Sequence, residues 1–319
     1  MGIITFLKKW TLPSSLVIGA IAYLLFSKIP FLVPSGNLLG PLFIDIIPLV
    51  LFVMLFVTFC KIQIKDLRPR KWHFILQAIR ITLSGILVFF ISITDDANLK
   101  LILEGVFVCV ICPTAAAAPV ITEKLGGSIA SLTIYTIIAN VVTSIIIPLF
   151  FPMVEKTSDI SFLIAFSQLL RNVLVVLVAP LCLAMLTRRY APAIATRIKS
   201  MKNLAFYLWG FNLSILSGIT IANILKSTVS GWVLTILLLS PLVVTIVLFA
   251  IGKVVGRHYG DSISAGQALG QKNTSVGLWL TIAFLNPVAS VAPGAYAIWQ
   301  NLFNAWQLWY KDKYGYIKW

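Results

Sequence analysis

The sequence has few charged residues, and this scarcity sets its class. Only 11% of the 319 residues are charged, whereas 59% are hydrophobic. A water-soluble domain would need a far more polar surface. The apolar residues form ten segments, each near the ~20 residues that cross the hydrocarbon core of a bilayer. The segments are 13–28, 40–60, 72–93, 101–121, 127–152, 160–186, 203–225, 231–255, 262–286 and 289–309.

These segments predict an all-α integral membrane protein with ten transmembrane helices. Because the loops between them are too short for a soluble domain, residues 1–319 are expected to form a single polytopic membrane domain in the lipid bilayer.

Acidic residues are scarcer still, and none of the ten is expected at the centre of a helix. The chain therefore lacks the mid-membrane carboxylate that a cation/proton antiporter requires. An intramembrane enzyme is disfavoured because no His, Asp or Glu lies at the membrane centre beside a Ser or Cys. The four cysteines do not have zinc-type spacing. We therefore expect no enzyme activity and no cofactor, with sodium as the one exception to consider.

Basic residues outnumber acidic ones by 25 to 10, which gives a net charge of +15. If the N-terminus is cytoplasmic, most of these residues lie on the cytoplasmic side, and only Arg80, Arg171 and Lys272 fall within helices. This asymmetry is the positive-inside rule. It predicts a multi-pass protein of the plasma (inner) membrane with both termini in the cytoplasm. It also explains the charge without nucleic acid, which would need a folded basic surface.

Two of the ten segments are interrupted in the middle. They are 101–121, which contains Cys112-Pro113-Thr114 and Pro119, and 262–286, which contains Gly270-Gln271-Lys272-Asn273-Thr274. An interruption leaves backbone groups unbonded, which the membrane interior tolerates only against protein or a water-filled cavity. Paired interruptions in matching halves are typical of the binding site of a secondary transporter. The alternative is a pair of kinks that serves helix packing alone.

The two halves of the sequence resemble each other. A shift of 161 residues aligns Tyr135 and Asn140 with Tyr296 and Asn301, and brings the two interrupted segments together. The halves are about 1–155 and about 156–319. Because each half holds five segments, the second enters the membrane from the opposite side, which gives an inverted 5+5 repeat. We expect the fourth and ninth helices to cross near the bilayer centre at their interruptions.

Three motifs after the second interruption resemble the last two helices of the bile acid:sodium symporter family. They are G-Q-K-N-T-S at 270–275, A-P-G-A at 292–295 and I-W-Q-N at 298–301. Cys112-Pro113 resembles the C-P that opens the other crossover helix of that family, and Gln77 resembles a glutamine of its second sodium site. The resemblance implies a core domain of helices three to five and eight to ten, and a panel domain of helices one, two, six and seven. It also implies alternating-access transport of small organic anions, normally driven by two sodium ions.

The chain departs from this family where the resemblance implies sodium ligands. A Ser-Asn pair is replaced by Ala118-Pro119, a glutamate by Ala268 and a glutamine by Lys272. The retained positions that could still bind sodium are Gln77, Thr136 and Asn273. A sodium ion about 4 Å from a lysine ammonium would be repelled by about 4 kcal/mol at an effective dielectric constant of about 20.

We therefore expect Lys272 to replace a bound sodium ion as a tethered cation in a transporter that is sodium-independent or proton-coupled. Burial disfavours the charged form of a lysine, so Lys272 could bind and release the coupling proton. Its alternative role is a structural one, in which it caps the free carbonyls of the fourth helix. The alternative functions are a conventional sodium symporter and a non-transporting membrane receptor on the same scaffold.

Other polar residues within the predicted helices are candidates for substrate contact. Arg80 either contacts an anionic substrate or extends to the cytoplasmic headgroups. Arg171 is expected in the panel wall that faces the substrate cavity. Asn140 and Asn301 either bond the freed backbone at the crossing or hold helices together. The full set of expected substrate-binding or coupling residues is Gln77, Arg80, Pro113, Thr114, Pro119, Thr136, Asn140, Arg171, Gln271, Lys272, Asn273, Thr274, Gln300 and Asn301.

Overall fold

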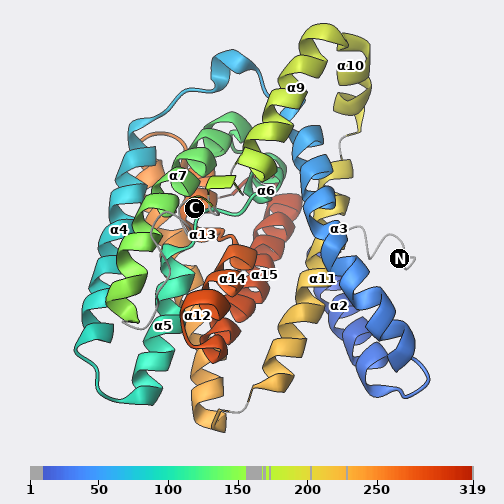
Figure 1. The fold of residues 1–319 in the computed structure, drawn as a ribbon. Helices are drawn as coiled ribbons and strands as arrows, with labels where there is room; N and C mark the ends of the chain where they lie inside the picture. The colour runs from blue at the N-terminus through green and yellow to red at the C-terminus, as the bar shows by residue number, and fades with distance from the viewer. Residues whose placement is uncertain are drawn as a thin grey trace.

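The computed structural model describes residues 10–155, 167, 170, 171, 174–201, 203–227 and 229–317. This part of the chain is helical (Figure 1), and an isolated bridge is the only β-type pairing found in it. Six described helices are long and apolar enough to cross a membrane. They are α2 (Thr11–Lys28), α3 (Val33–Phe59), α4 (Lys71–Ser92), α7 (Ile129–Val154), α11 (Leu204–Lys226) and α12 (Gly231–Arg257). The all-helical membrane architecture is therefore confirmed.

Both interrupted segments are broken where the sequence predicts. The first consists of α5 (Ala97–Ile111) and α6 (Ala118–Leu125), and the second of α13 (Ser262–Gly270) and α14 (Thr274–Phe284). The last segment is α15 (Val291–Tyr314), which follows the short helix η3 (Pro287–Ser290).

The sixth segment, 160–186, lies partly outside the described residues. Its described end contains η2 (Leu174–Val178) and α9 (Ala179–Tyr190), and the chain then bends by 118° into α10 (Pro192–Ser200). This bent pair would be a seventh membrane-spanning element.

Two helices, α3 and α15, extend furthest beyond their predicted segments. Helix α3 begins at Val33 instead of residue 40, because Pro34 lies in its first turn, where no backbone N–H is needed. Helix α15 continues to Tyr314 instead of residue 309 and ends at Gly315, whose φ of 78° is left-handed and suits glycine.

The buried apolar residues form three clusters. These clusters divide the helices into two groups that meet at the interrupted segments. One cluster joins α2, α3, α9 and α11 with residues of α6. A second cluster joins α4, α5, α7, α12, α13 and α15, and a third packs α14 against α4, α5 and α7. In Figure 1, α4, α5 and α7 lie along one side of the molecule and α2, α3 and α11 along the other, with α12 to α15 between them.

Helices α12 and α13 touch backbone to backbone. A Cβ atom added to Gly252 would lie 2.4 Å from the carbonyl oxygen of Ala265, and one added to Gly256 would lie 2.4 Å from the Cβ atom of Ala265. Glycines four residues apart present a smooth helix face, which lets two helices in a membrane approach closely. This contact fixes α13, the helix that leads into the second interruption.

Candidate functional site at the crossing of the interrupted segments

Local backbone chemistry explains both interruptions. Pro113 has no N–H to continue α5, and it restricts the preceding residue to extended conformations. Cys112 accordingly has φ −51° and ψ 141°. In the second segment Gln271 is also extended, with φ −97° and ψ 105°, and the Asn273 side chain caps the new helix by accepting the Val276 N–H at 3.3 Å.

The two unwound linkers pair with each other. Thr114 and Lys272 form an antiparallel bridge. The Ala115 N–H donates to the Gln271 carbonyl at 2.9 Å, and the Asn273 N–H donates to the Pro113 carbonyl at 2.8 Å. The prediction that the interrupted segments meet at their unwound points is confirmed.

The 161-residue shift that aligns the two halves of the sequence needs a correction. Helices α5 and α13 end at Ile111 and Gly270, which are 159 positions apart in the numbering, whereas the alignment of the two halves has a shift of 161. The linker after α5 is also longer, because α6 begins at Ala118 while α14 begins at Thr274. A gap-free shift therefore cannot superpose both interruptions. Because proline is tolerated only in the first turn of a helix, Pro119 sets where α6 begins.

Lys272 lies at the crossing and is only 2% exposed. Its Nζ atom donates to the carbonyl oxygens of Val110 at 2.8 Å and Cys112 at 3.2 Å. These carbonyls belong to the end of α5, where the helix dipole places a partial negative charge of roughly half a unit. No ion pair involving Lys272 is found within the described part of the chain. The ammonium thus takes the position of a cation held by carbonyl oxygens, and it also caps the helix.

Arg80 is 3% exposed and contacts the same helix end. Its Nη1 atom donates to the Ile111 carbonyl at 3.0 Å and to Thr143 Oγ1 at 2.6 Å. Its Nη2 atom donates to Gln77 Oε1 at 2.6 Å and to the Ala139 carbonyl at 3.1 Å. Of the two alternatives for Arg80, extension to the headgroups is wrong, because buried oxygen acceptors on α4, α5 and α7 hold its guanidinium inside the bundle.

Gln300 fixes the backbone of Lys272 from α15. The Lys272 N–H donates to Gln300 Oε1 at 2.7 Å, and Gln300 Nε2 donates to the Lys272 carbonyl at 3.2 Å. The end of α13 is capped by hydroxyl groups: Tyr296 Oη donates to the Gly270 carbonyl at 2.7 Å, and Thr114 Oγ1 to the Ala268 carbonyl at 2.7 Å. Neutral donors thus cap α13, whereas cations cap α5.

Of the two roles considered for Asn140 and Asn301, the structure shows bonds within and between helices and none to the unwound backbone at the crossing. Asn140 Nδ2 donates to the Thr136 carbonyl and Asn301 Nδ2 to the Ala297 carbonyl, each at 2.8 Å and one turn back in its own helix. Asn301 Oδ1 also accepts from the indole of Trp209 on α11 at 3.3 Å. Both asparagines therefore serve helix structure and packing in this arrangement.

The oxygens expected to bind sodium have other partners. Gln77 Oε1 accepts from Arg80, Thr136 Oγ1 donates to the Leu132 carbonyl at 2.8 Å, and Asn273 Oδ1 accepts from Val276. Within the described residues, no group of three His, Cys, Asp or Glu side chains could hold a metal ion. The side chains at the crossing do not fit a sodium ion, because ammonium and guanidinium groups already occupy the oxygens at the end of α5.

The remaining predicted residues divide by position. Gln271 and Thr274 are buried in and after the second linker, and Pro119 lies in the first turn of α6. The Gln271 amide has no hydrogen-bond partner among the described residues. Arg171 is exposed and has no bond to the crossing, and its neighbour Asn172 lies outside the described residues.

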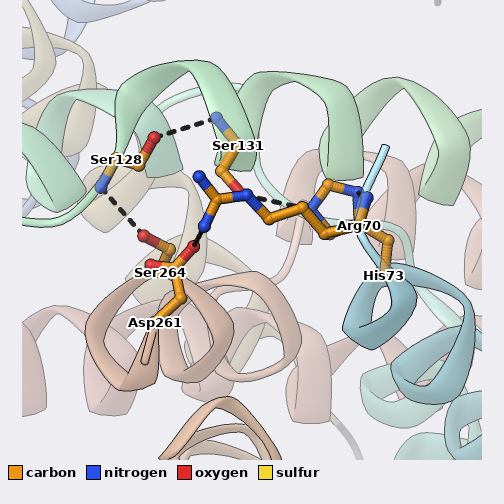
Figure 2. Close-up of polar contacts among 6 residues, drawn as sticks. All are labelled: Arg70, His73, Ser128, Ser131, Asp261 and Ser264. Carbon is orange, nitrogen blue, oxygen red and sulfur yellow. Dashed lines mark hydrogen bonds and ion pairs between the residues drawn. The ribbon is translucent and has the colours of Figure 1, made fainter. Parts of the chain in front are cut away.

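Six residues tie together the starts of α4, α7 and α13: Arg70, His73, Ser128, Ser131, Asp261 and Ser264 (Figure 2). Arg70 pairs with Asp261 at 3.1 Å. The Ser128 N–H donates to Ser264 Oγ at 2.9 Å, and His73 Nε2 lies 3.1 Å from Ser131 Oγ. Two open cavities of about 890 and 760 Å³ border this cluster, and neither is lined by Lys272 or Arg80.

Sequence reasoning missed Thr143 and the role of Tyr296. Tyr296 aligned with Tyr135 in the comparison of the two halves, but nothing in the sequence indicated that its hydroxyl bonds the end of α13. Thr143 gave no signal, because one hydroxyl residue in an apolar helix is ordinarily satisfied by its own backbone.

These observations define a multi-pass membrane protein whose interrupted helices meet inside a bundle of apolar helices. The chain belongs to the Sodium Bile acid symporter family, whose model matches residues 48–227, more than half of the sequence. The match includes Arg80 and the first interruption but ends before Lys272. No curated protein is similar enough to the chain to match it. At the level of the family, the chain is a transporter and not an enzyme.

Proposed function

We propose that the chain is a secondary active transporter of a small organic anion that works by alternating access without bound sodium. Lys272 takes the place of one sodium ion. The observation that carries this proposal is the buried ammonium bonded to the Val110 and Cys112 carbonyls. Carbonyl oxygens at a broken helix end are where transporters of this architecture bind coupling cations. A lysine in that position supplies a positive charge that stays attached to the protein.

The architecture that we propose has ten transmembrane helices in an inverted 5+5 repeat. The panel contains α2, α3, α9 and α11, which share one buried cluster. The core contains α4 to α7 and α12 to α15, most of which share the others. Both termini face the cytoplasm of a plasma (inner) membrane. The interrupted segments lie in the core, so movement of the panel would expose the crossing to one side and then to the other.

The charges at the crossing favour an anionic substrate. Helices α6 and α14 begin there, and helix N-termini carry partial positive charge and free N–H groups that bind anions. Lys272 and Arg80 add two cationic groups, and no ion pair neutralises either of them within the described residues. A small organic anion would therefore be attracted to this level of the membrane.

A tethered cation limits how transport can be driven. A sodium ion leaves with the substrate, whereas Lys272 stays and can change its charge only by exchanging a proton. Transport is then either uniport or coupled to a proton carried by Lys272. The competing proposal is a conventional sodium symporter, which the name of the family favours. It requires sodium to bind without a carboxylate beside the Lys272 ammonium.

Uptake of labelled organic anions into proteoliposomes tests the proposal, with native protein, Lys272→Gln and Lys272→Arg under an imposed pH gradient in sodium-free choline buffer. For a proton-coupled carrier we expect native uptake to follow the pH gradient. Lys272→Gln should lose this response, and Lys272→Arg should lose it too, because arginine keeps its proton. For a uniporter we expect uptake that does not depend on the pH gradient. Of the two variants, only Lys272→Arg should then retain uptake. Binding without any flux would instead indicate a receptor.

A further inference from the structure

Oxygen acceptors hold the two terminal nitrogens of the Arg80 guanidinium, whereas its Nε atom has no hydrogen-bond partner among the described residues. All four terminal N–H groups of its Nη1 and Nη2 atoms have a partner: Gln77 Oε1, the Ile111 carbonyl, the Ala139 carbonyl and Thr143 Oγ1. The Thr143 hydroxyl donates its own proton to the Ala139 carbonyl at 2.6 Å. Its oxygen can therefore only accept toward Arg80. Each of these four oxygens presents a lone pair to one of the two terminal nitrogens of the same cationic group.

Such an oxygen set is the kind that binds a hard cation. Amide, hydroxyl and backbone carbonyl oxygens are ligands that hard metal ions prefer. The four oxygens come from α4, α5 and α7, and one of them belongs to the last residue of α5, where the helix dipole is negative. With the Lys272 bonds included, the carbonyls of three consecutive residues, Val110, Ile111 and Cys112, all accept from side-chain cations.

We propose that Arg80 is a second tethered cation, seated in a latent cation site that would accept sodium if the guanidinium were removed. The inference deepens the proposed sodium-independent function and rests on it. Both positive charges at the end of α5 then belong to the protein. They differ in one respect, because arginine stays protonated whereas lysine can exchange its proton. Arg80 therefore supplies a fixed charge, and only Lys272 could carry a coupling proton.

The competing explanation is that Arg80 only ties α4, α5 and α7 together. Both explanations predict that removing the side chain destabilises the protein, because buried acceptors lose their donors. They differ in the response to ions. A structural tie, once cut, is not restored by sodium, whereas a latent cation site binds the ion and regains stability.

The test is the thermal unfolding of purified native protein and Arg80→Ala in 100 mM sodium chloride and in 100 mM choline chloride. We expect the native melting temperature to be the same in both salts. Arg80→Ala should melt lower in choline and recover by about 3 °C in sodium, the size expected for an ion at about ten times its Kd. Equal melting of the variant in both salts would overturn the proposal.

Two further variants make the result specific. Arg80→Lys keeps a cation in the site, so its melting temperature should not depend on sodium. Arg80→Gln removes the cation and should be stabilised by sodium, and it replaces Arg80→Ala if that variant does not fold. Lys253→Ala removes a buried lysine from α12 and serves as the matched control. It should lose stability without any dependence on sodium. Sodium-dependent uptake by the native protein would refute the proposed function. The latent cation site is refuted separately, if the melting temperatures of Arg80→Ala and Arg80→Gln do not depend on sodium.

Discussion

Replacing Gln300 by leucine should weaken the crossing by an amount that the structure sets. The Gln300 side chain is 1% exposed and makes two bonds to the backbone of Lys272. The Lys272 carbonyl also accepts from the Thr274 N–H at 3.0 Å, so this carbonyl keeps a partner in the variant. The Lys272 N–H loses its Gln300 partner and has no other acceptor among the described residues.

The expected cost follows from these two groups. A buried donor without a partner costs about 1–3 kcal/mol, and the second bond to the carbonyl contributes about 1 kcal/mol. The apolar leucine side chain offsets part of this loss, because a buried amide no longer has to be desolvated. We expect a net loss of about 2–3 kcal/mol. At roughly 2 °C per kcal/mol for a chain of this size, the melting temperature falls by about 4–6 °C.

Gln307 provides a matched control on the same helix. It is 0% exposed, but its amide has no hydrogen-bond partner among the described residues. Gln307→Leu should therefore be neutral or stabilising by about 1 kcal/mol, because it removes an unpaired buried polar group. Thermal unfolding of both variants decides the matter. Equal losses of stability in Gln300→Leu and Gln307→Leu would show that the two Gln300 bonds to Lys272 do not stabilise the protein.

Three further predictions concern the scaffold outside the crossing. Gly252→Ala should cost at least about 2 kcal/mol in thermal unfolding, because its Cβ atom would meet the Ala265 carbonyl oxygen at 2.4 Å. Gly85→Ala, whose Cβ atom would have no neighbour nearer than 3.9 Å, should gain about 1 kcal/mol from helix propensity. A double-mutant cycle on Arg70 and Asp261 should give a coupling below about 1 kcal/mol that declines with salt, because the Arg70 side chain is 48% exposed. Coupling of several kcal/mol would contradict the last prediction.

The sequence was sufficient to locate the two interruptions. Pro113 and the polar run around Lys272 stand out in apolar segments because they conflict with an uninterrupted helix. Their pairing also followed from the sequence, and the linker bonds confirm it. The exact shift between the halves could not be read, because a linker that contains proline needs a different number of residues from one that does not.

The partners of the polar side chains could not be predicted with the same success. Asn140 and Asn301 occupy matching positions, but an asparagine is short and readily bonds the carbonyl one turn back in its own helix. The longer side chain of Gln300 reaches across to the second linker. The position of Arg80 left open whether it contacts a substrate or extends to the headgroups, and three of its four acceptors come from helices that lie far away in the sequence. Such acceptors are known only once the helices are packed.

The central claim is that the protein supplies its own cation at the crossing. The most direct measurement is the initial rate of uptake of a labelled organic anion by native protein in proteoliposomes, first with sodium outside and then with choline in its place. If Lys272 replaces the sodium ion, the initial rate should be the same in both buffers. A rate that collapses in choline would show that transport requires sodium and that Lys272 does not replace it.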